Sequence, residues 1–248
     1  MERTTWIQIC GPLVVKLRGK RVEQRLPGRQ GRLLFAYLAA AGARPASRDE
    51  LLDAIWPEGS PAAADGALSA LLSKLRQVLG SPAIEGRTTV QLRLPDDAWV
   101  DLEAAREALH RAESALARGD WPQAYGAGRV PQHVAVRGFL GGEAAPWIEA
   151  ERRRLESMYL RSLEIVTAAS LRLGGAELAT AERAASALAE RAPYRESGHR
   201  LLMEVLHARG DTAEALRCYE RLRVLLREEL GVAPSEEAKA LHRRLLAP

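Results

Sequence analysis

The sequence predicts a mainly α-helical protein that opens with a small module of strands and helices. Three observations predict it: short β-rich runs precede three helical patterns near the start, an alternating run closes that region, and nearly everything after it has helical periodicity. The 248 residues suffice for one large or two ordinary domains, and the 47% apolar content is that of a globular chain with a core. We therefore expect two domains, 1–98 and 99–248.

The first elements are expected to be short antiparallel strands. β-rich runs at residues 6–10, 13–17 and 22–26 are separated by a Gly-Pro pair and by an Arg-Gly-Lys turn. After Pro27, apolar residues recur at the spacing of one helix face, which predicts a first helix that ends near Gly42.

Two further helices and a hairpin complete this region. Ser47 begins the second helix with a capping box, because Glu50 stands three residues on. The third helix is expected from Ala62 to Leu79; its leucine stripe must face a core, while the opposite face carries short polar or cationic side chains. Residues 83–94 read as a hairpin with an arginine near its tip. The order of sheet, three helices and hairpin is that of a winged helix-turn-helix.

The rest of the chain is expected to be all helical and tetratricopeptide-like, apart from an irregular Gly- and Pro-rich section at 126–146. Three times a glycine is followed five positions later by an alanine, as suits helix pairs in which Gly ends one helix and Ala lets two backbones approach. Coincidental helix-end glycines in an alanine-rich chain are the alternative. The three pairs are Gly119 with Ala124, Gly174 with Ala179, and Gly210 with Ala215.

The net charge of +4 is concentrated near the N-terminus. Residues 1–48 hold 10 basic and 2 acidic side chains, residues 49–100 hold 4 and 8, and residues 101–248 hold 22 of each. A basic region joined to a neutral remainder suggests a polyanion partner for the first region. An ordinary surface charge distribution is the alternative.

Several motifs, in this order along nearly the whole chain, resemble one known family. Residues 28–34, 47–56 and 72–80 resemble the OmpR-type DNA-binding domain of the Streptomyces antibiotic regulatory protein family. Residues 213–223 and 228–235 look like the bacterial transcriptional activation domain that follows it. The resemblance implies a cytoplasmic, sequence-specific regulator of transcription, expected to be an activator that binds direct repeats in double-stranded DNA near a promoter. It also implies a homodimer, at least on DNA, that recruits RNA polymerase.

The third helix would enter the major groove, and cationic side chains around it would contact phosphates. Spacings of four and three residues place Ser69, Ser73 and Arg76 on one face. We expect Arg76 to read guanine or to clamp a phosphate, unless it merely pairs with Asp53 or Glu50. The candidates for base or phosphate contacts are Ser69, Ser73, Arg76 and Gln77. The further candidates for backbone contacts are Arg29, Arg32, Arg48, Lys74 and Arg87.

The loop between the second and third helices is a candidate RNA polymerase contact, as the resemblance implies for OmpR-type proteins. It contains Glu58, Gly59 and Ser60. The helical domain is expected to serve dimerisation and activation. The alternative is that its apolar faces bury only its own core.

We expect no enzyme, no cofactor, no metal site and no membrane segment. The five histidines are scattered without metal-type spacing, and neither a nucleophile elbow nor a phosphate-binding glycine loop is present. Cys10 and Cys218 lie too far apart in sequence to indicate a disulfide framework. The remaining alternative is a tetratricopeptide-like scaffold whose winged helix binds protein rather than DNA.

Overall fold

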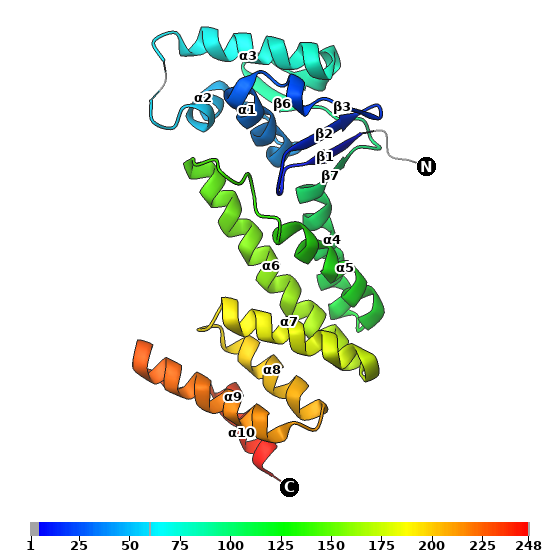
Figure 1. Ribbon diagram of the computed structural model, residues 1–248, viewed down its shortest axis with the longest axis vertical. Coiled ribbons are helices and arrows are strands. Elements are labelled where there is room, and N and C mark those ends of the chain that lie inside the picture. Colours follow the sequence, from blue (N-terminus) through cyan, green and yellow to red (C-terminus); the bar gives the residue numbers. More distant parts are fainter. Residues whose placement is uncertain (1–4, 60, 248) are drawn as a thin grey trace. The chain divides into compact units, whose positions relative to one another are not determined.

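The computed structural model describes residues 5–59 and 61–247, and it is mainly helical with two small sheets (Figure 1). The expected mainly helical class with small sheets is confirmed. The chain packs as two compact units: the first unit comprises Met1–Arg106 and Val134–Leu155, and the second unit comprises Glu107–His133 and Glu156–Pro248. The domain boundary expected at residue 98 stays a prediction, while the packing shows that a later segment returns to the N-terminal unit.

The first sheet has the strand order β3-β2-β1-β7. Its strands are β1 (Trp6–Gln8), β2 (Val14–Leu17), β3 (Lys20–Arg21) and β7 (Trp99–Val100). The sheet is mixed rather than purely antiparallel, because β7 pairs with β1 in parallel. The strand expected at 22–26 is wrong: Glu23–Arg25 form a 3-10 turn, in which the Glu23 carboxylate accepts a hydrogen bond from the backbone N–H of Val15.

Three helices and a second sheet complete the N-terminal part of the first unit. The helices are α1 (Gly28–Ala41), α2 (Arg48–Ile55) and α3 (Ala64–Leu79). The second sheet has the order β4-β6-β5, with β4 (Ala46–Ser47), β5 (Ile84–Glu85) and β6 (Thr89–Leu92). The capping box of Ser47 and Glu50 is confirmed at the start of α2. Leu68, Leu72 and Leu75 are buried as the leucine stripe of α3 predicts.

Residues 134–155 fold onto this part of the first unit. The Asp101 carboxylate is completely buried, accepts the backbone N–H groups of Ile9 and Cys10 at 3.0 Å each, and pairs with Arg137 at 3.0 Å. The indole N–H of Trp147 donates to the carbonyl of Ala54 at 3.0 Å. These contacts join segments that lie far apart in sequence, which no local periodicity predicts.

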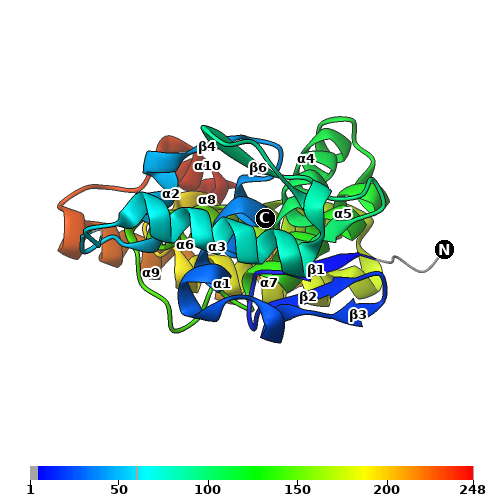
Figure 2. The same ribbon diagram turned by 90° about the horizontal axis from the view of Figure 1, so that it is seen from above.

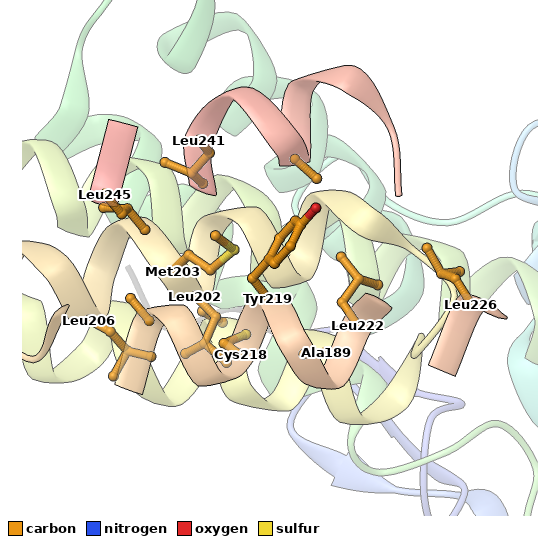
Figure 3. Packing of buried hydrophobic residues seen from close by; sticks show 13 residues of the cluster. Ala189, Leu202, Met203, Leu206, Cys218, Tyr219, Leu222, Leu226, Leu241 and Leu245 are labelled. Atoms are coloured by element: carbon orange, nitrogen blue, oxygen red, sulfur yellow. The ribbon is translucent and has the colours of Figure 1, made fainter. Parts of the chain in front are cut away.

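The second unit consists of packed helices. It draws on α4 (Asp101–Ala117), α5 (Trp121–Ala135) and α6 (Pro146–Leu173), each of which also contributes to the first unit. It continues with α7 (Leu178–Arg191), α8 (Glu196–Ala208), α9 (Thr212–Leu225) and α10 (Glu236–Leu246). Figure 3 shows the core between the last helices, where Met203, Tyr219 and Leu241 pack together.

The irregular section expected from residue 126 is wrong over its first part, because α5 continues through Pro131 to Ala135. At Gly128 this part of α5 packs closely against α6. A Cβ atom at Gly128 would lie 2.9 Å from Cγ2 of Val166 on α6, so only a glycine allows this close approach.

The expected glycine–alanine pairs hold at two of three sites. Gly119 and Gly210 have positive φ, and the alanines that follow them, Ala124 and Ala215, are fully buried. At the middle site Ala179 is exposed, which corrects the expectation, and Ala181 is the buried residue instead. The reason is the 3-10 turn Gly175–Glu177, which delays the start of α7.

Candidate nucleic-acid interface

Helix α3 has one buried and one exposed side. Opposite its buried leucines, Ser69, Ser73 and Gln77 are exposed, as is the flanking Lys74. Figures 1 and 2 show α3 as an outer helix of the first unit, lying across α1, with the β5–β6 hairpin next in the chain. The side chains on the exposed face are short or flexible, so they leave the helix slim.

Arg48 connects the start of α2 to the first turn of α3. Its Nε donates to the Asp65 carboxylate at 2.9 Å, and its Nη2 donates to the Asp65 carbonyl and to Oγ of Ser69, each at 3.0 Å. Its Nη1 reaches the carbonyl of Arg87 in the hairpin turn at 3.5 Å. The Arg48 side chain is 25% exposed and that of Asp65 is 79% exposed, so the arginine is the held partner and the carboxylate faces solvent.

Arg76 connects the end of α3 to the hairpin. Its Nε donates to the carbonyl of Ile84 at 3.1 Å, and its Nη2 donates to the carbonyl of Gly86 at 3.0 Å. The structure thus gives Arg76 hairpin carbonyls as partners rather than Asp53 or Glu50. Its guanidinium orients the hairpin relative to α3, a role that the sequence spacing did not suggest.

The hairpin turn requires a glycine. Gly86 has a φ of +92°, and a Cβ atom there would lie 1.8 Å from the carbonyl oxygen of Thr89. The next residue, Arg87, is exposed. The turn therefore holds an arginine side chain in solvent beside α3.

The other candidate cations differ in their partners. Nε of Arg29 donates to the Glu143 carboxylate at 2.7 Å. In the part of the chain that the structure describes, Arg32, Lys74 and Arg87 are exposed and no ion pair joins them to a carboxylate. The structure therefore separates the cationic candidates into a paired set, formed by Arg29 and Arg48, and an unpaired set.

The start of α2 is fixed by electrostatics as well as by capping. The backbone N–H of Ser47 and the guanidinium of Arg44 hold the pKa of the Glu50 carboxyl below its ordinary value. Arg44 lies 2.8 Å from that carboxylate and also donates to the hydroxyl of Tyr37. The charge on Glu50 is thereby maintained where it caps the helix that precedes α3.

Glu58 and Gly59 of the candidate polymerase loop are exposed, and Ser60 lies outside the described residues. Among the residues that the structure places, no group of three or more His, Cys, Asp or Glu side chains is arranged to hold a metal ion. No described helix has the length and apolarity needed to cross a bilayer.

Sequence reasoning found the exposed face of α3 but missed the protein partners of its arginines. The contacts of Arg48 with Asp65 and of Arg76 with the hairpin carbonyls have no signature in the local sequence. The glycine in the hairpin turn was the one available signal that a tight turn lies next to the end of α3.

Comparisons with known proteins decide the family. The family described as bacterial transcriptional activator domain matches residues 100–246. The regulatory protein DnrI of Streptomyces peucetius is 30% identical over 262 residues, which cover 97% of this chain and 91% of that protein. The chain belongs to the Streptomyces antibiotic regulatory protein family. Membership confirms the resemblance seen in its helix-turn-helix and C-terminal motifs.

Other relatives of this family member are longer. The regulatory protein AfsR of Streptomyces griseus is 33% identical over 246 residues, and the match covers 96% of this chain but only 24% of AfsR. The chain thus spans about a quarter of that relative. A solved structure of Mycobacterium tuberculosis EmbR, in complex with a low affinity phosphopeptide, aligns with a TM-score of 0.84 at 23% identity, over 99% of this chain and 65% of EmbR. That likeness shows a shared fold.

Proposed function

We propose that this chain is a sequence-specific DNA-binding regulator of transcription, an activator that acts near a promoter. The observation that carries the proposal is the exposed polar face of α3 beside a hairpin that Arg76 holds in position. In this proposal the N-terminal part of the first unit is a winged helix-turn-helix, and helices α7 to α10 form a tetratricopeptide-like array. Membership of a family of regulatory proteins supports it.

The proposed mechanism follows from the shape of α3. The major groove is about 12 Å wide and presents each base pair as a distinct pattern of donors and acceptors. Ser69, Ser73 and Gln77 are the proposed base or phosphate contacts, because they are exposed on one side of the helix. The unpaired Arg32, Lys74 and Arg87 are proposed as phosphate contacts.

Arginines that already have partners in the protein are proposed to act differently. Arg29 and Arg48 would reach phosphate only by sharing or leaving Glu143 and Asp65. We propose that Arg76 acts mainly by positioning the hairpin, since its Nε and Nη2 atoms already donate to hairpin carbonyls. The protein would act in the cytoplasm without enzymatic activity or cofactor.

Two partners beside DNA belong to the proposal. RNA polymerase would contact the loop at Glu58, Gly59 and Ser60, and a second copy of the chain would bind the adjacent direct repeat. Sedimentation with and without a two-repeat DNA tests the second point. A strict monomer on a fragment with two intact repeats would contradict it.

Titration of the chain against its own upstream promoter DNA at rising salt tests the DNA proposal. Affinity should fall as salt rises, because binding releases counterions from the phosphates. Charge reversal at Lys74 and Arg87 together should abolish binding without unfolding the chain, since both side chains are exposed. Binding that is indifferent to salt and to both reversals would favour a scaffold that recognises protein.

A further inference from the structure

A cavity of about 360 Å³ opens in the first unit between the end of α1, the start of α4 and the start of α6. Its size lies at the lower end of the range of about 300–1,000 Å³ for small-molecule sites. The charged side chains that line it are Arg44, Arg106, Glu151 and Arg154. Three of the lining residues are alanines, whose small side chains leave that part of the wall open.

The charges in this cavity do not balance. Glu151 is its single acidic lining residue, and it pairs with Arg106 at 2.9 Å and with Arg154. Arg44, the third arginine, pairs with Glu50, which is not part of the lining. The lining residues therefore carry three positive charges and one negative charge, and counting Glu50 as the partner of Arg44 leaves an excess of one positive charge. A guanidinium has five N–H donors, and the contacts of Arg154 within the described chain use few of them.

Two aromatic rings form another part of the lining. Tyr37 and Trp147 meet edge to face, with ring centroids 5.1 Å apart. The indole N–H of Trp147 donates to the carbonyl of Ala54, and the hydroxyl oxygen of Tyr37 accepts from Arg44. These two side chains therefore offer an occupant apolar ring surface and the O–H donor of Tyr37.

We propose that this cavity binds a small organic anion with a flat ring, such as an aromatic carboxylate. The anionic group would accept hydrogen bonds from the guanidiniums of Arg44 and Arg154, and the ring would lie against Tyr37 and Trp147. Bidentate pairing of a guanidinium with a planar anion supplies both attraction and orientation. The buried Glu151 keeps Arg106 and Arg154 in place before the ligand arrives.

The site has a direct connection to the helix before α3. Arg44 is shared between the cavity and Glu50, which caps α2. A bound anion competes with Glu50 for this guanidinium and so alters the support of α2. Any effect of this competition on DNA affinity rests on the proposed DNA binding, whereas occupation of the cavity does not.

The test uses the full chain and two probes of matched shape, naphthalene-1-carboxylate and protonated naphthalene-1-methylamine. Calorimetric titration should show saturable binding of the carboxylate, at least about tenfold tighter than that of the amine. Arg154→Gln should weaken carboxylate binding by about tenfold or more. The Arg154 side chain is 71% exposed, so this variant keeps the fold.

Arg153→Gln is the matched control, because Arg153 is exposed on α6 next to Arg154 and does not line the cavity. It should bind the carboxylate as the unchanged chain does. The proposal is overturned by absence of saturable binding, by equal affinity for both probes, or by full affinity in both Arg154→Gln and Arg44→Gln. Promoter binding measured without probe is a separate readout, so failure of this site is distinguishable from failure of DNA binding.

Discussion

Arg76 and Lys74 lie two residues apart on α3, yet the structure predicts different effects when each is replaced by alanine. Arg76→Ala removes two hydrogen bonds to the carbonyls of Ile84 and Gly86, at 3.1 and 3.0 Å. Lys74→Ala removes an exposed charge that no described carboxylate neutralises. The first change should free the hairpin, and the second should remove one phosphate contact.

The size of each effect follows from these contacts. A hydrogen bond from a charged donor contributes about 1.5–3 kcal/mol when it is not exposed to solvent. Because Arg76 is partly exposed, we assign about 2 kcal/mol to its two bonds together. If the hairpin must be held for binding, up to about 30-fold in affinity is lost. Loss of one phosphate contact instead lowers the slope of log K against log salt by about 0.9.

Dissociation constants for promoter DNA at four or five salt concentrations separate the two roles. Arg76→Ala should bind more weakly with an unchanged salt slope, while Lys74→Ala should have a shallower slope. Arg76→Lys is the matched control, because it keeps the charge but loses the planar fork that reaches both carbonyls. A shallower slope in Arg76→Ala, restored by Arg76→Lys, would refute the positioning role and identify Arg76 as a phosphate contact.

Three further changes have defined outcomes. Asp101→Ala should lower the free energy of unfolding by roughly 3–5 kcal/mol in urea titrations, because it leaves buried N–H groups and a guanidinium without their acceptor. Glu50→Gln should reduce the stability lost on acidification: the lowered pKa of Glu50 means that its stabilisation is complete above about pH 4.3 and is lost as the pH falls through that lowered pKa. On α5, Gly128→Ala should destabilise by about 1–3 kcal/mol through its clash with Val166, whereas Gly126→Ala should stabilise by about 0.5–1 kcal/mol.

Each of these expectations has an outcome that contradicts it. Equal stability of Asp101→Ala and the unchanged chain would show that the carboxylate does not hold the first unit together. If the unchanged chain and the Glu50→Gln variant lose stability identically as the pH falls, the charge of Glu50 does not stabilise α2. The two glycines are each other's control, because nothing lies within 4 Å of a Cβ added at Gly126. Equal effects at both would contradict close packing of α5 on α6.

The sequence predicted a structural feature correctly wherever neighbouring residues alone determine that feature. The capping box of α2 depends on two residues three positions apart, and the leucine stripe of α3 depends on a periodicity of 3.6 residues. Both can be read without knowing what the helix packs against. The same holds for Gly119 and Gly210, whose positive φ ends a helix by backbone conformation alone.

Prediction failed where a distant segment decides the local structure. The parallel pairing of β7 with β1 joins strands that are far apart in sequence. α5 continues through Pro131 although proline is unfavourable there, because packing against α6 outweighs local preference. At the middle glycine–alanine pair, a short 3-10 turn moved the buried position from Ala179 to Ala181. Spacing alone contains no information on such an insertion.

In the candidate interface, too, local features could be predicted and contacts with distant segments could not. Residue types and spacing identified the exposed face of α3, since polar side chains opposite a leucine stripe must face solvent. They did not identify partners, because an arginine reaches several carboxylates or carbonyls at similar energy. Only the fold selects Asp65 for Arg48 and Glu143 for Arg29.

The pairing of these arginines changes what the basic N-terminal region implies. Among its cations, Arg21, Arg29, Arg44 and Arg48 each pair with a carboxylate in the folded chain, so sequence charge overstates the charge available to DNA. If the unpaired Arg32, Lys74 and Arg87 are the phosphate contacts, the salt slope for one copy should be only about −3. If the pairs of Arg29 and Arg48 open on DNA, two phosphate contacts are added and the slope for one copy becomes about −4.5. Glu143 and Asp65 would then act as competitors of phosphate, and Asp65→Asn should strengthen binding.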